Sequence, residues 1–440
     1  MSPDRCGDII ILRGGTLIDG TGRKPFEDAA VVIEGTRVTA VCKEDECEIP
    51  KDAKVVSTHG QFVIPGLMDL HVHLNSESLG RPMDNRLWIL SNPPVMQIMH
   101  ALRNARSCLE AGFTTIRSMS NLCGLIWDPS LRDAIEMGII QGPRILASGN
   151  MISGIRRGTR SMLAFAYGPQ PSVIGYQHRL ADGPDECRKA VREVVGAGAD
   201  FVKIMVTGTI AGELERATWV TYTRGEIEAI ADEAHHLERK VAAHAYAAEG
   251  ILNALEAGVD TLEHGMYLGE EACNMMVRKG IFLVPTLSVL HNFITNGMKT
   301  GAPAHMLEKT REGFDASISS FKAARQAGVK IACGTDSQHT WAPCGENSLE
   351  LELMVKHGMS EMEAIVAATK TSAEAIGRDD TLGTIEPGKF ADILILDASP
   401  LDNIGVLRQK NNIKMIVKNG KIVVNRTLDT ESSAGGAGGS

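Results

Sequence analysis

Six side chains in this sequence of 440 residues could take part in metal chemistry, and each ends or interrupts a short apolar run. In chain order they are His71, His73, Lys203, His244, His264 and Asp336. Imidazole nitrogens together with a carboxylate oxygen suit a borderline divalent cation such as zinc. The pattern indicates a metal centre, in which the lysine needs a separate explanation because an ammonium group would repel a metal.

The two closely spaced histidines follow an apolar segment, residues 63–70, that has the character of a buried strand. Because side chains alternate along a strand, His71 and His73 share one face. The other candidates belong to similar runs at 201–206, 241–244, 261–264 and 331–336. We therefore expect each of them at or near the end of a strand.

The middle of the chain, residues 66–380, alternates these apolar runs with segments of helical period, such as 185–197, 224–238 and 248–257. Repeated strand-then-helix order predicts an α/β fold with a parallel sheet covered by helices, and this length fits closure into a (β/α)8 TIM-like barrel. Catalytic groups in such barrels lie at the carboxyl ends of the strands. The six candidates fall at those ends.

Both ends of the chain consist of short β-rich runs separated by turns. The runs are 9–12, 30–33 and 38–41 within residues 1–65, and 393–396, 413–417 and 422–424 within residues 381–431. Asn419-Gly420, between the last two runs, is a strong hairpin signal. We expect the two ends to form a small β-sandwich domain beside the barrel, and the Gly- and Ser-rich residues 432–440 to form a flexible tail.

Composition limits the classes of partner. A net charge of -9 and a pI near 5.8 give no sign of a basic face for nucleic acid or an anionic membrane, and no apolar run reaches the length of a membrane span. The nine cysteines are scattered and follow no signal peptide, which predicts reduced thiols in a cytoplasmic protein. We expect a homo-oligomer that acts on a small-molecule substrate.

Three further motifs carry a resemblance to a known superfamily. The motifs are GTLIDG at 15–20, AGFTT at 111–115 and LGTIEPGKFAD at 382–392. With the six candidates in their order, nearly the whole chain resembles the amidohydrolase superfamily, in its branch of imidazolonepropionase-like and prolidase-like enzymes. The resemblance implies two divalent ions, expected to be zinc, and a Lys203 that has reacted with carbon dioxide to form a bridging carbamate.

The resemblance also assigns roles within the site. It implies that His71, His73 and Asp336 hold one ion, that His244 and His264 hold the other, and that Lys203 spans both. Two cations would lower the pKa of a shared water and so supply a hydroxide nucleophile. Asp336 would take its proton and pass it to the leaving nitrogen. Tyr246, two residues after His244, would donate a hydrogen bond to the carbonyl oxygen under attack.

The function expected on these grounds is hydrolysis of a carbon–nitrogen bond in a small amide, N-acyl amino acid, dipeptide, carbamate or urea. One alternative is a mononuclear deaminase or cyclic-amide hydrolase. Such deaminases commonly carry a glutamate three residues after the histidine equivalent to His244, where this chain has Ala247. The other alternative is a non-catalytic binding protein on the same barrel, which metal content would distinguish.

Overall fold

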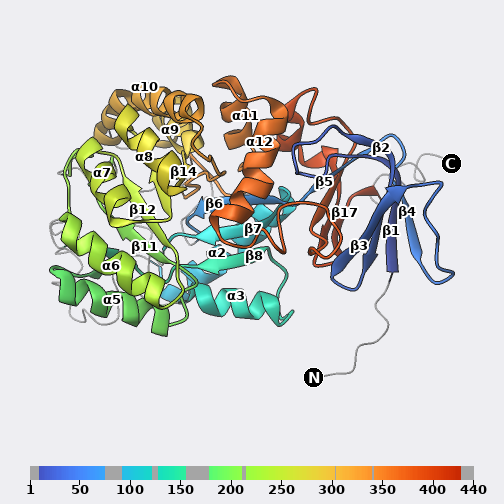
Figure 1. Cartoon of the computed structure of the whole chain (residues 1–440), viewed down its shortest axis with the longest axis horizontal. Coiled ribbons are helices and arrows are strands. Elements are labelled where there is room, and N and C mark those ends of the chain that lie inside the picture. The colour runs from blue at the N-terminus through green and yellow to red at the C-terminus, as the bar shows by residue number, and fades with distance from the viewer. Residues whose placement is uncertain are drawn as a thin grey trace, which may run out of the picture.

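The computed structural model describes residues 9–74, 92–120, 127–154, 178–210, 215–302, 304–338 and 341–427, which form an α/β fold. Figure 1 shows a helix-rich part built from the middle of the chain and a β-rich part that contains strands from both ends of the described chain. The predicted tail, 432–440, lies outside the described residues. In the part of the chain that is described, no helix is long and apolar enough to cross a bilayer.

Both ends of the chain contribute strands to one sheet in the β-rich part. Its strands are β1 (Ile9–Leu17), β2 (Phe26–Glu34), β3 (Arg37–Lys43), β4 (Lys54–Ser57), β5 (Phe62–Pro65), β15 (Ile393–Leu396), β16 (Ile413–Lys418) and β17 (Lys421–Asn425). Their order is β17-β16-β15-β5-β1-β2-β3, with β4 paired to β1. The two ends meet where β5 and β15 pair antiparallel, with Val63 opposite Ile395.

The predicted β-sandwich is only partly matched by this arrangement. The two ends do pair, and a buried cluster that includes Leu12, Val31, Ile393 and Val417 joins strands from both of them. The pairing gives a single eight-stranded sheet, so the second sheet that a sandwich requires is not confirmed. The exact domain boundaries stay a prediction.

Parallel strands form the interior of the helix-rich part. One sheet contains β6 (Leu67–Val72), β7 (Phe113–Ser118) and β8 (Arg144–Ala147), and the other contains β9 (Met151–Ser153), β10 (His178–Leu180), β11 (Val202–Met205), β12 (Val241–Ala245), β13 (Thr261–His264) and β14 (Phe282–Val284). Every residue of β6, β7, β11, β12 and β13 is buried. Burial on both faces explains why these strands read as continuous apolar runs.

The two parallel sheets are linked by a segment that is not itself a named strand. Ile331 forms a parallel bridge with Leu283 of β14, and Ser337 forms one with Val72 of β6. At the opposite side, the backbone N–H of Asp200 donates to Ala147 O of β8 at 2.7 Å. The parallel α/β part of the prediction is confirmed, but strand pairing among the described residues does not show a closed barrel.

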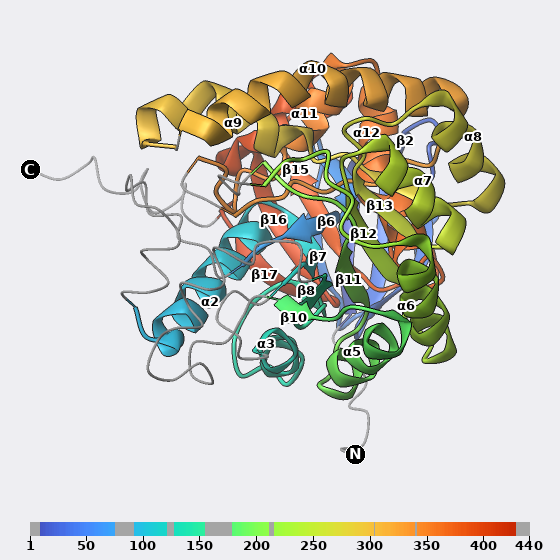
Figure 2. The same ribbon diagram turned by 90° about the vertical axis from the view of Figure 1, so that its left-hand side faces the viewer.

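Helices cover the parallel strands, as Figure 2 shows. They are α2 (Pro94–Glu110), α3 (Asp128–Glu136), α5 (Pro184–Gly196), α6 (Arg224–His236), α7 (Ala248–Ala257), α8 (Glu270–Lys279), α9 (Leu287–Thr300), α10 (Ala304–Ala327), α11 (Leu349–Lys356), α12 (Glu361–Val366) and α13 (Ser372–Ala375). A π-helical turn (Ala367–Thr371) joins α12 to α13, and two short 3-10 helices (Ile404–Arg408, Lys410–Asn412) precede β16.

Local signals explain where several of these helices begin and end. Thr223 and Glu226 form a capping box at the start of α6, in which each side chain bonds the backbone of the other residue. Helix α7 ends at Gly258, whose left-handed conformation stops it at little cost. The three helices predicted at 185–197, 224–238 and 248–257 are confirmed as α5, α6 and α7.

Candidate metal centre

Three of the predicted ligands lie together at the carboxyl end of β6. His71 Nε2 is 3.7 Å from Asp336 Oδ1, and His73 Nε2 is 3.3 Å from the same oxygen. One candidate ligand atom from each of the three residues lies within 4.8 Å of the other two, and all three side chains are buried. Ligands about 2.1 Å from a tetrahedral ion lie roughly 3.4 Å apart, so this donor set fits a divalent metal.

Hydrogen bonds orient the two imidazoles of this group. His71 Nδ1 lies 2.7 Å from Glu263 Oε2, and His73 Nδ1 lies 3.0 Å from Ser120 Oγ. In each ring the Nε2 atom is the one that faces Asp336. Burial, followed by the positive charge of Lys203, holds the pKa of His71 well below its usual range. The His71 ring is therefore neutral, which is the form that binds a metal.

A fully buried ion pair between Arg117 and Glu263 holds the His71 ring through its Nδ1 atom. Arg117, on β7, donates from Nη2 to Glu263 Oε1 at 2.7 Å and from Nε to the carbonyl of Leu70 at 2.7 Å. Thr261 Oγ1 donates to the same Glu263 oxygen at 2.5 Å. The second Glu263 oxygen is left for His71. Arginine, glutamate and imidazole thus form a continuous chain across β7, β13 and β6.

His244 and His264 extend the cluster of imidazoles to neighbouring strands. The centroid of the His264 ring is 4.9 Å from that of His71 and 4.6 Å from that of His244. His264 Nδ1 lies 2.7 Å from Thr286 Oγ1, and His244 Nε2 lies 3.1 Å from Gly208 O. A carbonyl only accepts, so His244 Nε2 carries the proton and Nδ1 is left for a ligand role.

Lys203 is a buried residue of β11, which pairs with β12, the strand that carries His244. It is 1% exposed, and β11 pairs with β12 so that Met205 stands opposite His244. As an ammonium group, Lys203 would contribute to the lowered pKa of His71. A charged amine buried beside imidazoles is costly. A carbamate would remove the positive charge and present two oxygens instead.

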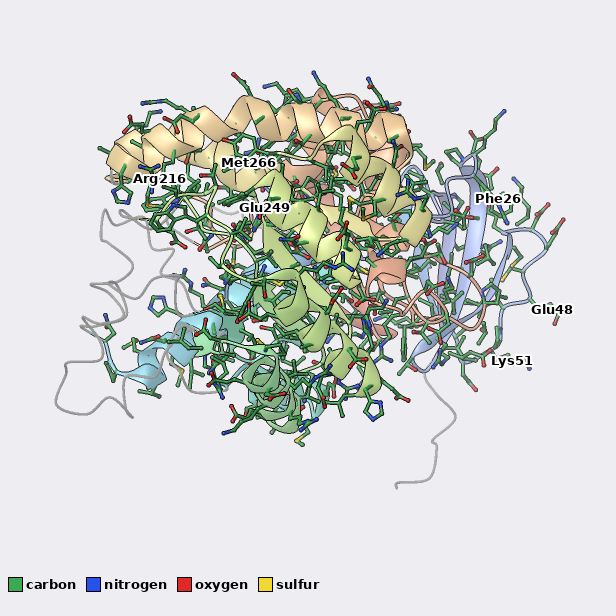
Figure 3. All side chains as sticks on the ribbon, turned by 60° about the vertical axis from the view of Figure 1, so that its left-hand side comes forward. Phe26, Glu48, Lys51, Arg216, Glu249 and Met266 are labelled. Atoms are coloured by element: carbon green, nitrogen blue, oxygen red, sulfur yellow. The ribbon has the colours of Figure 1, made fainter. Side chains whose placement is uncertain are left out.

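Tyr246 packs against both histidines of the second group. Its ring centroid is 4.5 Å from that of His244 and 5.0 Å from that of His264, and the side chain is 3% exposed. Met266, two residues after His264, belongs to the same buried apolar cluster as Tyr246. Figure 3 shows Met266 in the helix-rich part, away from Phe26 and Lys51 in the β-rich part.

A second buried carboxylate ties β6 to the segment that carries Asp336. Asp69 accepts hydrogen bonds from the backbone of His71 at 3.0 Å, from Thr335 Oγ1 at 2.6 Å and from Asn347 Nδ2 at 2.6 Å. Burial raises the pKa of Asp69 to about 6, against the opposite effect of these bonds. Asp69 thereby fixes the separation of His71 and Asp336.

All six predicted ligands and Tyr246 therefore lie in one buried region, while the supporting residues were missed by the sequence analysis. These are Asp69, Arg117, Glu263 and Thr286. A signal was available for three of them, since charged residues in otherwise apolar runs need buried partners. Nothing in the sequence shows which partner each one contacts.

Comparison with known proteins gives consistent matches over most of the chain. The profile of the Amidohydrolase family matches residues 62–423. Ochratoxinase from Aspergillus niger is 31% identical over 433 residues, which cover 94% of this chain and 86% of that protein. Its crystal structure matches with a TM-score of 0.83 and 28% identity, covering 96% of both chains.

Two other relatives point to the branch of the superfamily. The crystal structure of a Xaa-Pro dipeptidase with methionine bound in its active site matches with a TM-score of 0.83 and 30% identity, covering 95% of this chain and 100% of that one. Imidazolonepropionase from Geobacillus thermodenitrificans is 39% identical over 99 residues, which cover 22% of this chain and 23% of that protein.

Proposed function

Because the chain belongs to the amidohydrolase family, we propose that it is a binuclear metal-dependent hydrolase of small amides. Family membership and the named relatives support hydrolysis of amide-type carbon–nitrogen bonds. The observation that carries the two-metal proposal is that the ring of His264 lies 4.9 Å from that of His71 and 4.6 Å from that of His244, so the two groups of candidate ligands meet in one buried region. Members of this family depend on metal, and the cluster of His71, His73 and Asp336 fits one ion.

The proposed ligand sets follow from the nitrogen atoms that remain available. His71 and His73 offer Nε2 to the first ion beside Asp336, because their Nδ1 atoms are hydrogen-bonded. His264 offers Nε2 and His244 offers Nδ1 to the second ion, for the same reason. Lys203, as a carbamate, would reach both. Zinc accepts this mixture of nitrogen and oxygen donors.

Two divalent ions would lower the pKa of a water held between them and polarise the substrate carbonyl. The chain's own residues then have simple tasks. The Asp336 carboxylate accepts the proton of the attacking water and returns it to the leaving nitrogen. The Tyr246 hydroxyl donates to the carbonyl oxygen, where negative charge develops. Burial of the site excludes bulk water and strengthens each of these interactions.

We also propose that the two parallel sheets are two arcs of a (β/α)8 barrel. The link between β14, residues 331–337 and β6 supports closure on one side. The bond from Asp200 N to Ala147 O supports closure on the other side. In such a barrel His71, Lys203, His244, His264 and Asp336 all lie at the carboxyl ends of strands, where barrel enzymes hold their catalytic groups.

For the substrate we propose an amide in which one partner is an amino acid, as in an N-acyl amino acid or a dipeptide. The similarity to a Xaa-Pro dipeptidase supports this choice over carbamates and ureas. The proposed site handles a small molecule and has no requirement for nucleic acid or a membrane. A cytoplasmic location and a homo-oligomer remain part of the proposal.

The test compares turnover by the wild-type protein, Lys203→Ala and Asp336→Asn on a panel of N-acyl amino acids, dipeptides, carbamates and ureas. We expect Asp336→Asn to lower kcat by about 10²–10⁴-fold, because a general acid–base group contributes that much. Lys203→Ala should lose activity together with bound metal. The exposed Lys421→Ala, on β17, is the matched control and should behave like the wild-type protein.

Circular dichroism and urea unfolding show whether each variant is folded. Activity within a few-fold of the wild-type value in either Lys203→Ala or Asp336→Asn would overturn the proposed function. Wild-type protein that binds two metals and hydrolyses only carbamates or ureas would keep the metal mechanism and correct the substrate class.

A further inference from the structure

The residue before α9 has an unusual backbone conformation for its type. Thr286 is the N-cap of α9, with φ 52° and ψ 46°, in the left-handed region. N-cap residues normally have an extended backbone, and their side chain accepts a hydrogen bond from the first turn of the helix. Thr286 makes no such bond. Because it is β-branched, this conformation is strained.

The hydroxyl of Thr286 is directed to the candidate metal centre instead. Its Oγ1 lies 2.7 Å from Nδ1 of His264, and both side chains are buried. When Nε2 of His264 serves as the ligand, Nδ1 carries the hydrogen and donates it to Oγ1. This bond fixes the tautomer and the orientation of the ring.

A glutamate from another helix takes over the capping role. Glu350, in the first turn of α11, accepts the backbone N–H of Leu287 at Oε1 (2.9 Å) and that of Ser288 at Oε2 (2.7 Å). The carboxyl group is fully buried, and burial raises the pKa of Glu350 to about 8, against the opposite effect of these two bonds. Ser288 Oγ in turn donates to Thr335 O, next to Asp336, at 3.1 Å.

We propose that Glu350 caps α9 in place of Thr286 and so holds Thr286 in the left-handed conformation that orients His264 as a metal ligand. Thr286 is then a positioning residue for His264, and Glu350 is a positioning residue for Thr286. The inference rests on the proposed function, because it assigns a task to two residues of the second metal site. It implies that the strained backbone of Thr286 lowers the stability of the fold but improves metal binding.

The experiment uses Thr286→Gly and Thr286→Ser in the full-length protein. Zn²⁺ affinity is measured by competition with a chromophoric chelator, and the stability of the metal-free protein is measured by urea unfolding. Thr286→Gly relieves the strain but removes the hydroxyl, so we expect metal-free stability at or above the wild-type value. Affinity for the more weakly held ion should fall by about 10–100-fold, as for other partners of metal-bound histidines. Thr286→Ser keeps the hydroxyl and should keep the affinity.

Two further variants separate this role from a general effect on folding. Glu238→Gly relieves a left-handed residue (φ 56°) at an exposed position after α6, and its metal affinity should equal that of the wild-type protein. Glu350→Gln replaces one of the two accepting oxygens by an amide nitrogen, so affinity should fall as in Thr286→Gly. If Glu350→Gln does not fold, the Thr286 pair still tests the role of Thr286 as the positioning residue for His264.

Three outcomes would overturn the inference. They are wild-type affinity in Thr286→Gly, equal losses of affinity in Thr286→Ser and Thr286→Gly, or a loss of affinity matched by a loss of metal-free stability. Failure of the proposed function looks different, because the wild-type protein itself would then bind fewer than two ions.

Discussion

At the scale of single residues, the geometry of the candidate centre depends on the hydrogen-bond partner of the ring nitrogen that faces away from the metal position. His71, His73 and His264 each have Nδ1 hydrogen-bonded, to Glu263, Ser120 and Thr286 respectively. These partners decide which nitrogen is available and where it points. Among them Glu263 is the only carboxylate, and it is itself held by Arg117.

We predict that Glu263→Gln lowers metal affinity by about 10–100-fold while the protein stays folded. The amide has nearly the shape of the carboxylate, but it cannot accept from Arg117, Thr261 and His71 at once. Metal affinity is measured by chelator competition. The matched control is Asp392→Asn, which neutralises another buried carboxylate paired with an arginine, Arg144, in the β-rich part.

The control should lose stability and keep its metal affinity. An equal loss of affinity in Glu263→Gln and Asp392→Asn would show that any break in a buried ion pair has this effect. An unchanged affinity in Glu263→Gln would contradict the role of the glutamate.

The sequence predicted candidate ligands that the fold brings together, but it did not predict the residues that support them, for a physical reason. The ligands belong to runs whose alternation and order are visible in the chain. The supporting bonds join residues far apart, with 192 positions between His71 and Glu263 and 63 between Leu287 and Glu350. Such pairs depend on how strands lie beside one another, which no local pattern specifies.

At the scale of elements, residues with a strained backbone lie close to the candidate ligands. Three of the six non-glycine residues with positive φ in the described chain are His264, Thr286 and Asp336. His264 ends β13, Thr286 follows β14, and Asp336 lies in the segment that links β14 to β6. Residues in this region cost roughly 1–3 kcal/mol each and persist where surrounding contacts hold them. Here the contacts of Asp69 and Glu350 supply that support.

The hairpin between β16 and β17 was predicted from Asn419-Gly420 and is confirmed. Both residues have positive φ, 48° and 70°, and Lys418 pairs with Lys421. Burial, followed by the nearby charge of Arg144, lowers the pKa of Lys418 to about 8. Its amine donates to Gly142 O at 2.9 Å. The hairpin thus places a partly desolvated amine against the helix-rich part.

This amine predicts a pH dependence of stability. Between pH 8 and the ordinary lysine pKa of 10.5, the unfolded chain binds more protons than the folded chain, so the contribution of Lys418 to stability rises with pH. We expect the free energy of unfolding of the wild-type protein minus that of Lys418→Met to increase from pH 8 to pH 10. Urea unfolding at several pH values measures it, with Lys421→Met as the control for an exposed amine. A difference that stays constant or decreases would contradict the prediction.

At the scale of the whole molecule, strands from the two ends of the chain form one sheet that packs beside the helix-rich part, and none of the candidate ligands lies on that sheet. Arg144 of β8 bonds Thr115 at 3.0 Å and Asp392 at 2.5 Å, and it also bonds Asn419 of the hairpin, so one side chain fastens the two parts together. The sequence predicted that the two ends associate, because both consist of short β-rich runs. It did not predict whether they form one sheet or two, since strand order depends on long-range pairing.

The central claim is that one buried site holds two metal ions bridged by Lys203, and metal stoichiometry tests it most directly. Protein is purified without chelator and with bicarbonate present, and its metals are counted by elemental mass spectrometry. We predict two divalent ions per chain, mainly zinc, and fewer in Lys203→Ala. One ion per wild-type chain would contradict the claim and favour a mononuclear deaminase or cyclic-amide hydrolase, and no restorable ion would favour a binding protein.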